Sequence, residues 1–405
     1  MGGAHSHSHS HDLPDVEVGL VSRFFLLTAL ALVALATIIG LFVLWPGDGE
    51  KPTPPQYAAD GTTFPVGKVV SVSEPCPVIV ADPNAPPGSG EDFPEHCNEL
   101  TAQVGKDRVV IQVPPYVAKS GLQKGDEVKL ARIAGVDGAE PSWGWVGTQR
   151  NAPLGLLLVA FVLVTLVVAR LRGLMALVGL VFAGFVVAKF MLPGLLEGGS
   201  GIGIALVGSS VIMFVVLYLT HGLSVRTSTA LAGTLFGIAI ITAIGMWGVH
   251  AARLSGVSDD TNEYLMLYAP DLNYQGLLTS AVIIAGLGVL NDVTITQSSA
   301  VWELRAAAPE MTRLQLFISG MRIGRDHIAS TIYTIVFAYA GTALAVLMLL
   351  SLYERPLLDT LPDENIAAEI MRTLASAIGL VLAVPATTAI AALTVNGPRK
   401  VVTGQ

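Results

Sequence analysis

Four ionisable residues in the last third of the sequence could together carry an ion or a proton. Asp292 lies in a stretch without other charges, and Arg325, Asp326 and His327 are consecutive residues just before a largely apolar run. A guanidinium can pair with either carboxylate, and an imidazole gains or loses a proton near neutral pH. Such residues at the edge of apolar segments are typical of ion or proton relays in membranes.

Helical spacing extends this group into two polar stripes. Asp292, Thr296, Ser299 and Glu303 form the first, and Asp326, Ser330, Tyr333, Phe337 and Gly341 form the second. A carboxylate facing lipid costs at least ~2.5–3.5 kcal/mol. We therefore expect the stripes to face the bundle interior or a water-filled cavity, opposite each other across a cytoplasmic-side vestibule. The candidate relay residues are Asp292, Thr296, Arg325, Asp326, His327, Ser330 and Tyr333.

A purely structural role for the Arg-Asp-His triplet remains open. Asp326 suits the N-terminus of a helix through the helix dipole. Arg325 fits the excess of basic residues on the cytoplasmic side of membrane proteins. In this interpretation the triplet anchors a helix end, and only Asp292 has a role in transport.

The elements that must position these residues are membrane helices. Of the 405 residues, 52% are hydrophobic and only 13% are charged, with a mean hydropathy of +0.63. A soluble chain carries roughly 25% charged residues, so the composition predicts a polytopic α-helical membrane protein. Eight runs are long enough to span a bilayer: 24–44, 152–169, 174–192, 202–220, 229–250, 276–302, 327–350 and 373–395.

Lys and Arg gather in alternate connecting segments, whereas the other short loops are acidic. The positive-inside rule then places both termini in the cytoplasm and residues 45–151 outside it. We expect a multi-pass protein of a plasma membrane. Residues 1–23 and 397–405 would be cytoplasmic tails, 24–44 the first span, and 151–396 a seven-helix transmembrane domain.

The segment between the first two spans predicts a separate domain. A Pro-rich linker covers residues 45–62, and a small β domain covers residues 63–150. Its β-like runs are VGKVVSVS, ELTAQVG, DRVVIQVP, DEVKLARIA and WGWVGTQ. Five short strands favour a small β-barrel of OB type, and a small β-sandwich is the alternative.

Two groups of residues outside the spans could form a disulfide or bind a metal ion. Cys76 and Cys97 both fall in the exported domain, which favours a disulfide; zinc binding beside His96 is the alternative. The N-terminal tail carries four histidines that could gather a divalent metal, or could be incidental to a disordered polar tail. They are His5, His7, His9 and His11.

The connection between the sixth and seventh spans predicts an amphipathic helix near 310–323 on the cytoplasmic face. Pro309 should end the preceding helix, after which Met311, Leu314, Phe317 and Met321 recur at helical spacing. This helix could couple the two spans, or it could be a static interfacial turn.

Three segments resemble the YibE/F family of bacterial multispanning membrane proteins. They are YLTHGLSVRTSTALAGTLFG (218–237), GLGVLNDVTITQSSAVWEL (286–304) and IGRDHIASTIYTIVFAYAG (323–341). The resemblance implies one N-terminal span, an exported β domain and seven further spans. It implies no particular biochemical activity.

The sequence predicts a transporter more than an enzyme. It has no HExxH, GxSxG or Walker-type motif, so we expect no catalytic site, no cofactor and no nucleic-acid partner. The first hypothesis is a gradient-driven secondary transporter or exporter of a small substrate or ion in the lipid bilayer. The alternative is a non-transporting scaffold or sensor whose exported domain binds an envelope protein or polymer. An intramembrane enzyme is a third, less favoured interpretation.

Overall fold

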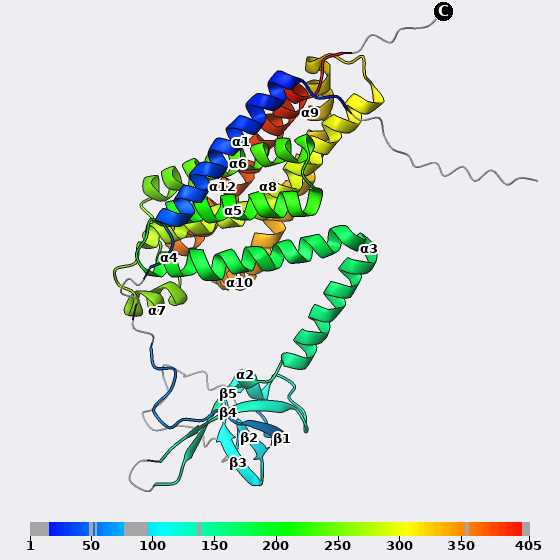
Figure 1. The fold of residues 1–405 in the computed structure, drawn as a ribbon. Coiled ribbons are helices and arrows are strands. Elements are labelled where there is room, and N and C mark those ends of the chain that lie inside the picture. The colour runs from blue at the N-terminus through cyan, green and yellow to red at the C-terminus, as the bar shows by residue number, and fades with distance from the viewer. Residues whose placement is uncertain are drawn as a thin grey trace, which may run out of the picture. The chain divides into compact units, whose positions relative to one another are not determined.

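The computed structural model describes residues 16–47, 52, 55–76, 96–135, 139–352 and 356–398 (Figure 1). The chain divides into two compact units. One unit is helical and comprises Met1–Thr53 and Thr165–Gln405; the other is Pro54–Val164, which contains a β-sheet. The predicted histidine-rich tail, with His5, His7, His9 and His11, lies outside the described residues.

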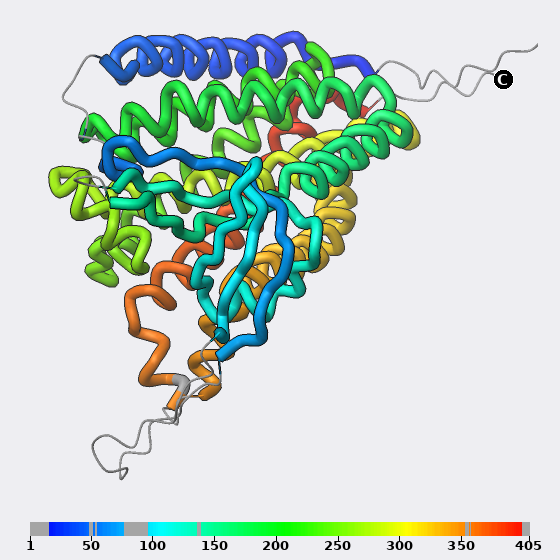
Figure 2. The backbone as a smooth tube through the Cα atoms, turned by 90° about the horizontal axis from the view of Figure 1, so that it is seen from below, coloured from blue at the N-terminus to red at the C-terminus, as the bar shows by residue number. Residues whose placement is uncertain are grey.

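The β unit is a five-stranded antiparallel sheet curled into a half-barrel. Its elements are β1 (Val66–Val72), β2 (Glu99–Val104), β3 (Asp107–Gln112), the short helix α2 (Pro115–Ala118), β4 (Glu127–Ile133) and β5 (Ser142–Thr148). The strand order is β3-β2-β1-β4-β5, and the strands lie side by side in Figure 2. All five runs predicted from the sequence form strands. The half-barrel is established, and the OB type stays a prediction.

Alternating side chains explain why these segments pair. Leu100 and Ala102 of β2, and Val128 and Leu130 of β4, point to one face and are fully buried in a single apolar core. A two-residue turn joins β2 to β3, and its first residue, Gly105, has φ +60°, a conformation that glycine adopts without strain.

The predicted disulfide is present. Cys76 follows β1 and Cys97 precedes β2, and the two residues are bonded with their Cα atoms 4.9 Å apart. The backbone N–H of Cys76 also donates to Asn98 Oδ1 at 3.1 Å. Because each sulfur is used by the other, the disulfide and not the zinc alternative describes this pair.

The helical unit contains most of the remaining elements. They are α1 (Leu20–Val43), α3 (Asn151–Val186, which begins in the β unit), the π-helix η1 (Val187–Met191), α4 (Leu192–Leu196), α5 (Gly201–His221), α6 (Val225–Ala251), α7 (Asp260–Tyr268), α8 (Tyr274–Ala307), α9 (Arg313–Thr342), α10 (Leu344–Leu352), α11 (Leu357–Thr360) and α12 (Glu364–Thr394).

Helices α6, α8 and α12 form the centre of this unit, and α1 lies alongside α5 (Figures 1 and 2). Glycines allow the central helices to approach closely, because a Cβ built on Gly237 of α6 would lie only 2.5 Å from Leu290 of α8. Hydroxyl groups add polar contacts, such as the 2.7 Å hydrogen bond between Thr234 and Thr294. Small residues and shared hydroxyls therefore set the packing of the core.

Six of the described helices are long and apolar enough to cross a membrane. The pair α9 and α10 would add a seventh as one span bent by 65°. The sequence predicted eight and counted 152–169 and 174–192 separately. The stretch from Asn151 to Leu196, which is one of the six, consists of two helices that meet at a kink at Arg170, with a φ of 50° and a ψ of −130°, so the predicted break between these two runs is present. The multi-pass helical class is supported, and the number of spans stays a prediction.

The amphipathic helix predicted near 310–323 is not a separate element. From Arg313 the chain continues as α9 through to Thr342, and Gly320 and Gly324 are buried in its first half. Gly320 packs against Thr388 of α12, and Gly324 packs against Val384 of α12. Both glycines also lie against Gln297 of α8. Because no residue in this stretch breaks the helix and its glycine face is buried, the segment belongs to the bundle. Pro309 lies in the turn after α8, as predicted.

Candidate functional site

A cavity of about 1050 Å³ lies in the helical unit between α8, α9, α10 and α12. Most of its wall is apolar. Its polar lining residues are Asp292, Thr331, Thr334, Tyr339, Asn365, Glu369, Arg372 and Thr373. The volume is at the upper limit of the ~300–1,000 Å³ typical of small-molecule sites. The cavity is therefore large enough for a ligand, and its charged groups are few and specific.

Asp292 lines this cavity from α8. Its side chain is 69% exposed, whereas the adjacent Val293 and Thr294 are fully buried on the other side of the helix. Thr296, one turn further, is exposed and donates to the backbone carbonyl of Asp292 at 2.7 Å. The sequence predicted that Asp292 faces either the bundle interior or a cavity, and in the structure Asp292 lines the cavity. Thr296 is outside its lining.

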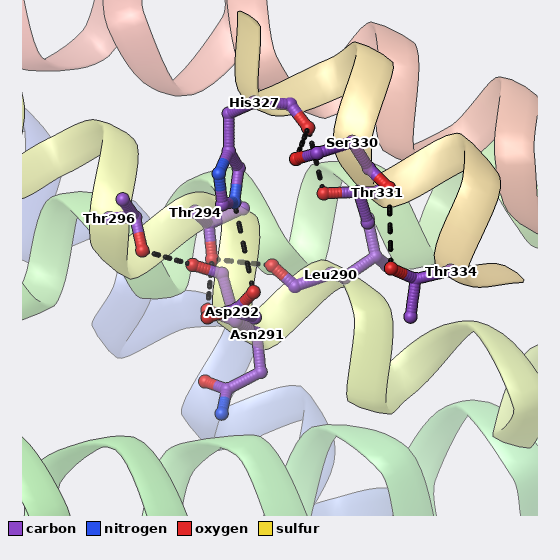
Figure 3. A network of polar contacts seen from close by, with 9 residues as sticks. All are labelled: Leu290, Asn291, Asp292, Thr294, Thr296, His327, Ser330, Thr331 and Thr334. Atoms are coloured by element: carbon purple, nitrogen blue, oxygen red, sulfur yellow. Dashed lines mark hydrogen bonds and ion pairs between the residues drawn. The ribbon is translucent and has the colours of Figure 1, made fainter.

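His327 of α9 is the residue that meets Asp292. Its Nε2 lies 3.7 Å from Asp292 Oδ2, and the two side chains point toward each other in Figure 3. This distance exceeds that of a hydrogen bond, but a protonated imidazole would form an ion pair there. The backbone carbonyl of His327 accepts hydrogen bonds from Ser330 Oγ at 3.1 Å and Thr331 Oγ1 at 2.8 Å. The carboxylate and the imidazole thus form one polar pair between two helices.

The other predicted residues of α9 lie on a different face. Arg325, Asp326, Ser330 and Tyr333 are exposed, and none of them lines the cavity. Within the described part of the chain, Arg325 forms no ion pair with Asp292 or Asp326, contrary to the expected pairing.

The orientation of α9 about its own axis explains this difference, because it differs from the predicted orientation by about one residue. The stripe predicted from Asp326 through Tyr333 is displaced by ~100° from the face that contains His327, Thr331 and Thr334. Gly320 and Gly324 mark the packed face, and steps of three or four residues from Gly324 lead to His327 and Thr331. The glycines were therefore the signal that could have oriented this helix.

The cavity also extends in the direction opposite to the predicted cytoplasmic vestibule. From Asp292 it runs toward the beginning of α12, where Asn365 and Glu369 line it. On the other side of Asp292, Gln297 is buried and donates from Nε2 to the Gly320 carbonyl at 2.8 Å and to Thr388 Oγ1 at 2.7 Å. This junction of α8, α9 and α12 is tightly packed, which leaves no room for a vestibule there.

Sequence reasoning missed the charged pair Glu369 and Arg372. Arg372 Nη1 donates to Glu369 Oε2 at 2.7 Å, and both side chains are about three-quarters buried. Their i, i+3 spacing on a helix was readable from the sequence. The predicted last span began at 373 and so placed them in a loop, but α12 begins at Glu364.

The described residues contain no group of three or more His, Cys, Asp or Glu side chains that could hold a metal ion.

One comparison with known proteins gives a match. A family model described as "YibE/F-like protein" matches residues 157–397, which contain α5 to α12 and every residue that lines the cavity. Neither the curated proteins nor the solved structures contain a match.

Proposed function

Because the chain belongs to the YibE/F-like family and contains several apolar helices long enough to cross a membrane, we propose that it is a secondary transporter or exporter driven by an ion gradient. The observation that carries this proposal is the cavity, whose wall contains Asp292 with His327 only 3.7 Å away. A carboxylate among apolar helices is costly and is typical of a substrate or ion pathway.

The pair suggests how a proton and a cationic substrate could be exchanged. Protonated His327 pairs with Asp292, so a cation that binds this carboxylate competes with the imidazolium. Binding of the proton and of the cation are thereby opposed, which is the coupling that an antiporter needs.

The proposed setting is a bacterial plasma membrane with both termini in the cytoplasm and the β unit outside. The positive-inside distribution of Lys and Arg supports this orientation. The proposal includes no enzymatic step, no cofactor and no nucleic-acid partner.

The proton current across the membrane, measured as a pH change inside proteoliposomes, tests the proposal, because the exchange of one proton for one monovalent cation moves no net charge. Proteoliposomes with the full chain would be exposed to a panel of small organic and inorganic cations. We expect a current with at least one class of cation, and we expect Asp292→Asn to reduce it by about tenfold or more, because a hydrogen bond to a charged group contributes ~1.5–3 kcal/mol.

Glu303→Gln is the matched control, since Glu303 is an exposed carboxylate on the same helix and outside the cavity lining. It should leave the current unchanged. A current of wild-type size from a correctly folded Asp292→Asn protein would contradict the proposal.

The scaffold or sensor alternative is supported by one observation, the separate compact β unit with its own apolar core. A binding module built this way would keep its function without a charged cavity. If deleting residues 60–148 abolished the cellular phenotype and Asp292→Asn did not, an envelope component bound by the β unit would be the better explanation.

A further inference from the structure

The cavity has a second charged group, well separated from Asp292. Val293 packs in the same apolar cluster as Leu380 and Val384 of α12, so Asp292 lies at the level of that part of the helix. Arg372 precedes Leu380 by two turns of α12, a distance of about 12 Å toward the beginning of the helix. Glu369 lies a further turn in that direction. Asp292 and the Glu369–Arg372 pair therefore line different ends of one cavity.

Arg372 has a donor that the protein itself leaves unused. Its Nη1 is bonded to Glu369, but its Nε is buried and has no hydrogen-bond partner among the described residues. A buried N–H of a charged group without an acceptor is unfavourable. The side chain as a whole is 28% exposed and lines the cavity, so an acceptor there can approach its exposed part, although not the buried Nε itself. The cavity wall thus offers a guanidinium donor and, beside it, the carboxylate of Glu369.

The rim of the cavity is apolar and exposed. Val336, Leu347, Ile370 and Leu374 line it and are between 37% and 54% exposed. In helices that cross a membrane, exposed side chains of this kind border acyl chains. The ligand that fits has a polar head that carries both charges and an apolar body.

We propose that this end of the cavity binds a phospholipid whose headgroup carries a phosphate and a primary ammonium group. The phosphate oxygens accept hydrogen bonds from Arg372, the ammonium donates to Glu369, and an acyl chain lies against Val336, Leu347, Ile370 and Leu374. Because Glu369 and Arg372 are together neutral, a zwitterion complements both of them. A choline headgroup has no N–H to donate, and a glycerol headgroup has no cation for Glu369. The site does not depend on Asp292 or on transport.

Native mass spectrometry of the full chain in detergent tests this assignment. Phosphatidylethanolamine, phosphatidylcholine and phosphatidylglycerol with identical acyl chains would be titrated in turn. We expect the wild-type protein to bind the ethanolamine lipid about tenfold more tightly than either of the others, since only that headgroup satisfies both charged side chains. Equal affinities for the three lipids would overturn the proposal.

Variants locate the site. Arg372→Gln and Glu369→Gln should each remove most of the preference for the ethanolamine lipid, and Glu303→Gln should retain it. If a single variant fails to fold, the double variant Glu369→Gln/Arg372→Gln removes the pair without leaving one buried charge alone. A preference that survives in the double variant contradicts the proposal.

Inorganic phosphate separates a lipid site from a simple anion site. Phosphate added in excess should not displace the ethanolamine lipid, because it lacks the ammonium and the acyl chain. If phosphate alone bound in an Arg372-dependent manner and displaced the lipid, the site would be one for a free anion, and the lipid assignment would be wrong.

Discussion

The amide of Gln297 joins three helices through two hydrogen bonds from one buried nitrogen. Its acceptors are the Gly320 carbonyl of α9 and the Thr388 hydroxyl of α12. Thr388 in turn donates to the Val384 carbonyl at 2.7 Å, close to Pro385, which lies inside α12. A single side chain therefore fixes the level of α9 and α12 relative to α8, next to the turn of α8 that carries Asp292.

Replacing Gln297 by Leu should lower the free energy of unfolding by about 1–3 kcal/mol, because two buried acceptors lose their donor. Thermal unfolding of the purified protein in detergent measures this change. Thr296→Val is the control, since Thr296 is exposed and bonds only within its own helix. Equal melting temperatures for Gln297→Leu and wild type would contradict the assigned role.

At the scale of single residues, the sequence predicted that Asp292 lies at a cavity but not which residue of α9 faces it. The cost of a carboxylate in hydrocarbon was enough to place Asp292 at a cavity. The partner depends on how α9 is rotated about its axis, and a rotation of one residue exchanged Asp326 for His327. Arg372 was missed because its role depends on where α12 begins.

The central helices are held together by small residues at their contact points. Gly233 of α6 lies directly against Thr387 of α12, so a Cβ at position 233 would overlap that side chain. The Gly233 and Gly237 pair was visible in the sequence as a small-xxx-small pattern, and both glycines are buried in α6.

Gly233→Ala should destabilise the helical unit by about 1–3 kcal/mol through overpacking. Gly184→Ala is the matched control, because nothing lies within 4 Å of a Cβ at Gly184 of α3. Alanine there should be neutral or stabilise by up to about 1 kcal/mol through helix propensity. In thermal unfolding, the melting temperature of Gly233→Ala should therefore fall. The melting temperature of Gly184→Ala should stay the same or rise. A larger loss of stability at Gly184 would be inconsistent with the packing.

Elements with strong local patterns were predicted well. Strands β1 to β4 bury alternate side chains, and all five strands formed within about two residues of their predicted runs. The predicted helix near 310–323 was not separate, since hydrophobic periodicity does not show whether two helical segments are continuous. The division of residues 151–196 was predicted correctly, because the chain kinks at Arg170, between the predicted runs 152–169 and 174–192.

At the scale of the whole molecule, the two compact units should respond independently to a local change. The bond between Cys76 and Cys97 closes a loop with a sequence separation of 21 within the β unit. A crosslink of this length stabilises by about 3 kcal/mol in the chain-entropy description.

Cys76→Ser/Cys97→Ser should therefore increase hydrogen–deuterium exchange in peptides that cover β1 to β3, with little change in peptides from α6, α8 and α12. Mass spectrometry of the full chain measures both sets in one experiment. The helical peptides serve as an internal control. Faster exchange in α6, α8 and α12 to the same extent would mean that the two units unfold together.

The first helix of the chain is attached to the last. The N–H of Gly19 donates to the Thr394 carbonyl, the N–H of Asn396 donates to the Glu17 carbonyl, and Val18 forms a β-bridge with Val395. Figure 1 shows the dark-blue beginning of α1 beside the red end of α12. Glu17 and Asn396 are 379 positions apart.

A ribosome would need about 20 to 80 s to synthesise the residues between them, at a rate of ~5–20 residues per second. During this interval α1 must wait in the bilayer without its final neighbour. Its sequence suits that delay, because Phe24, Leu32 and Ile38 are exposed apolar residues on the face opposite buried Leu26 and Leu30, and lipid can cover them. The later-synthesised α12 then completes the assembly by pairing with a helix that was inserted before it.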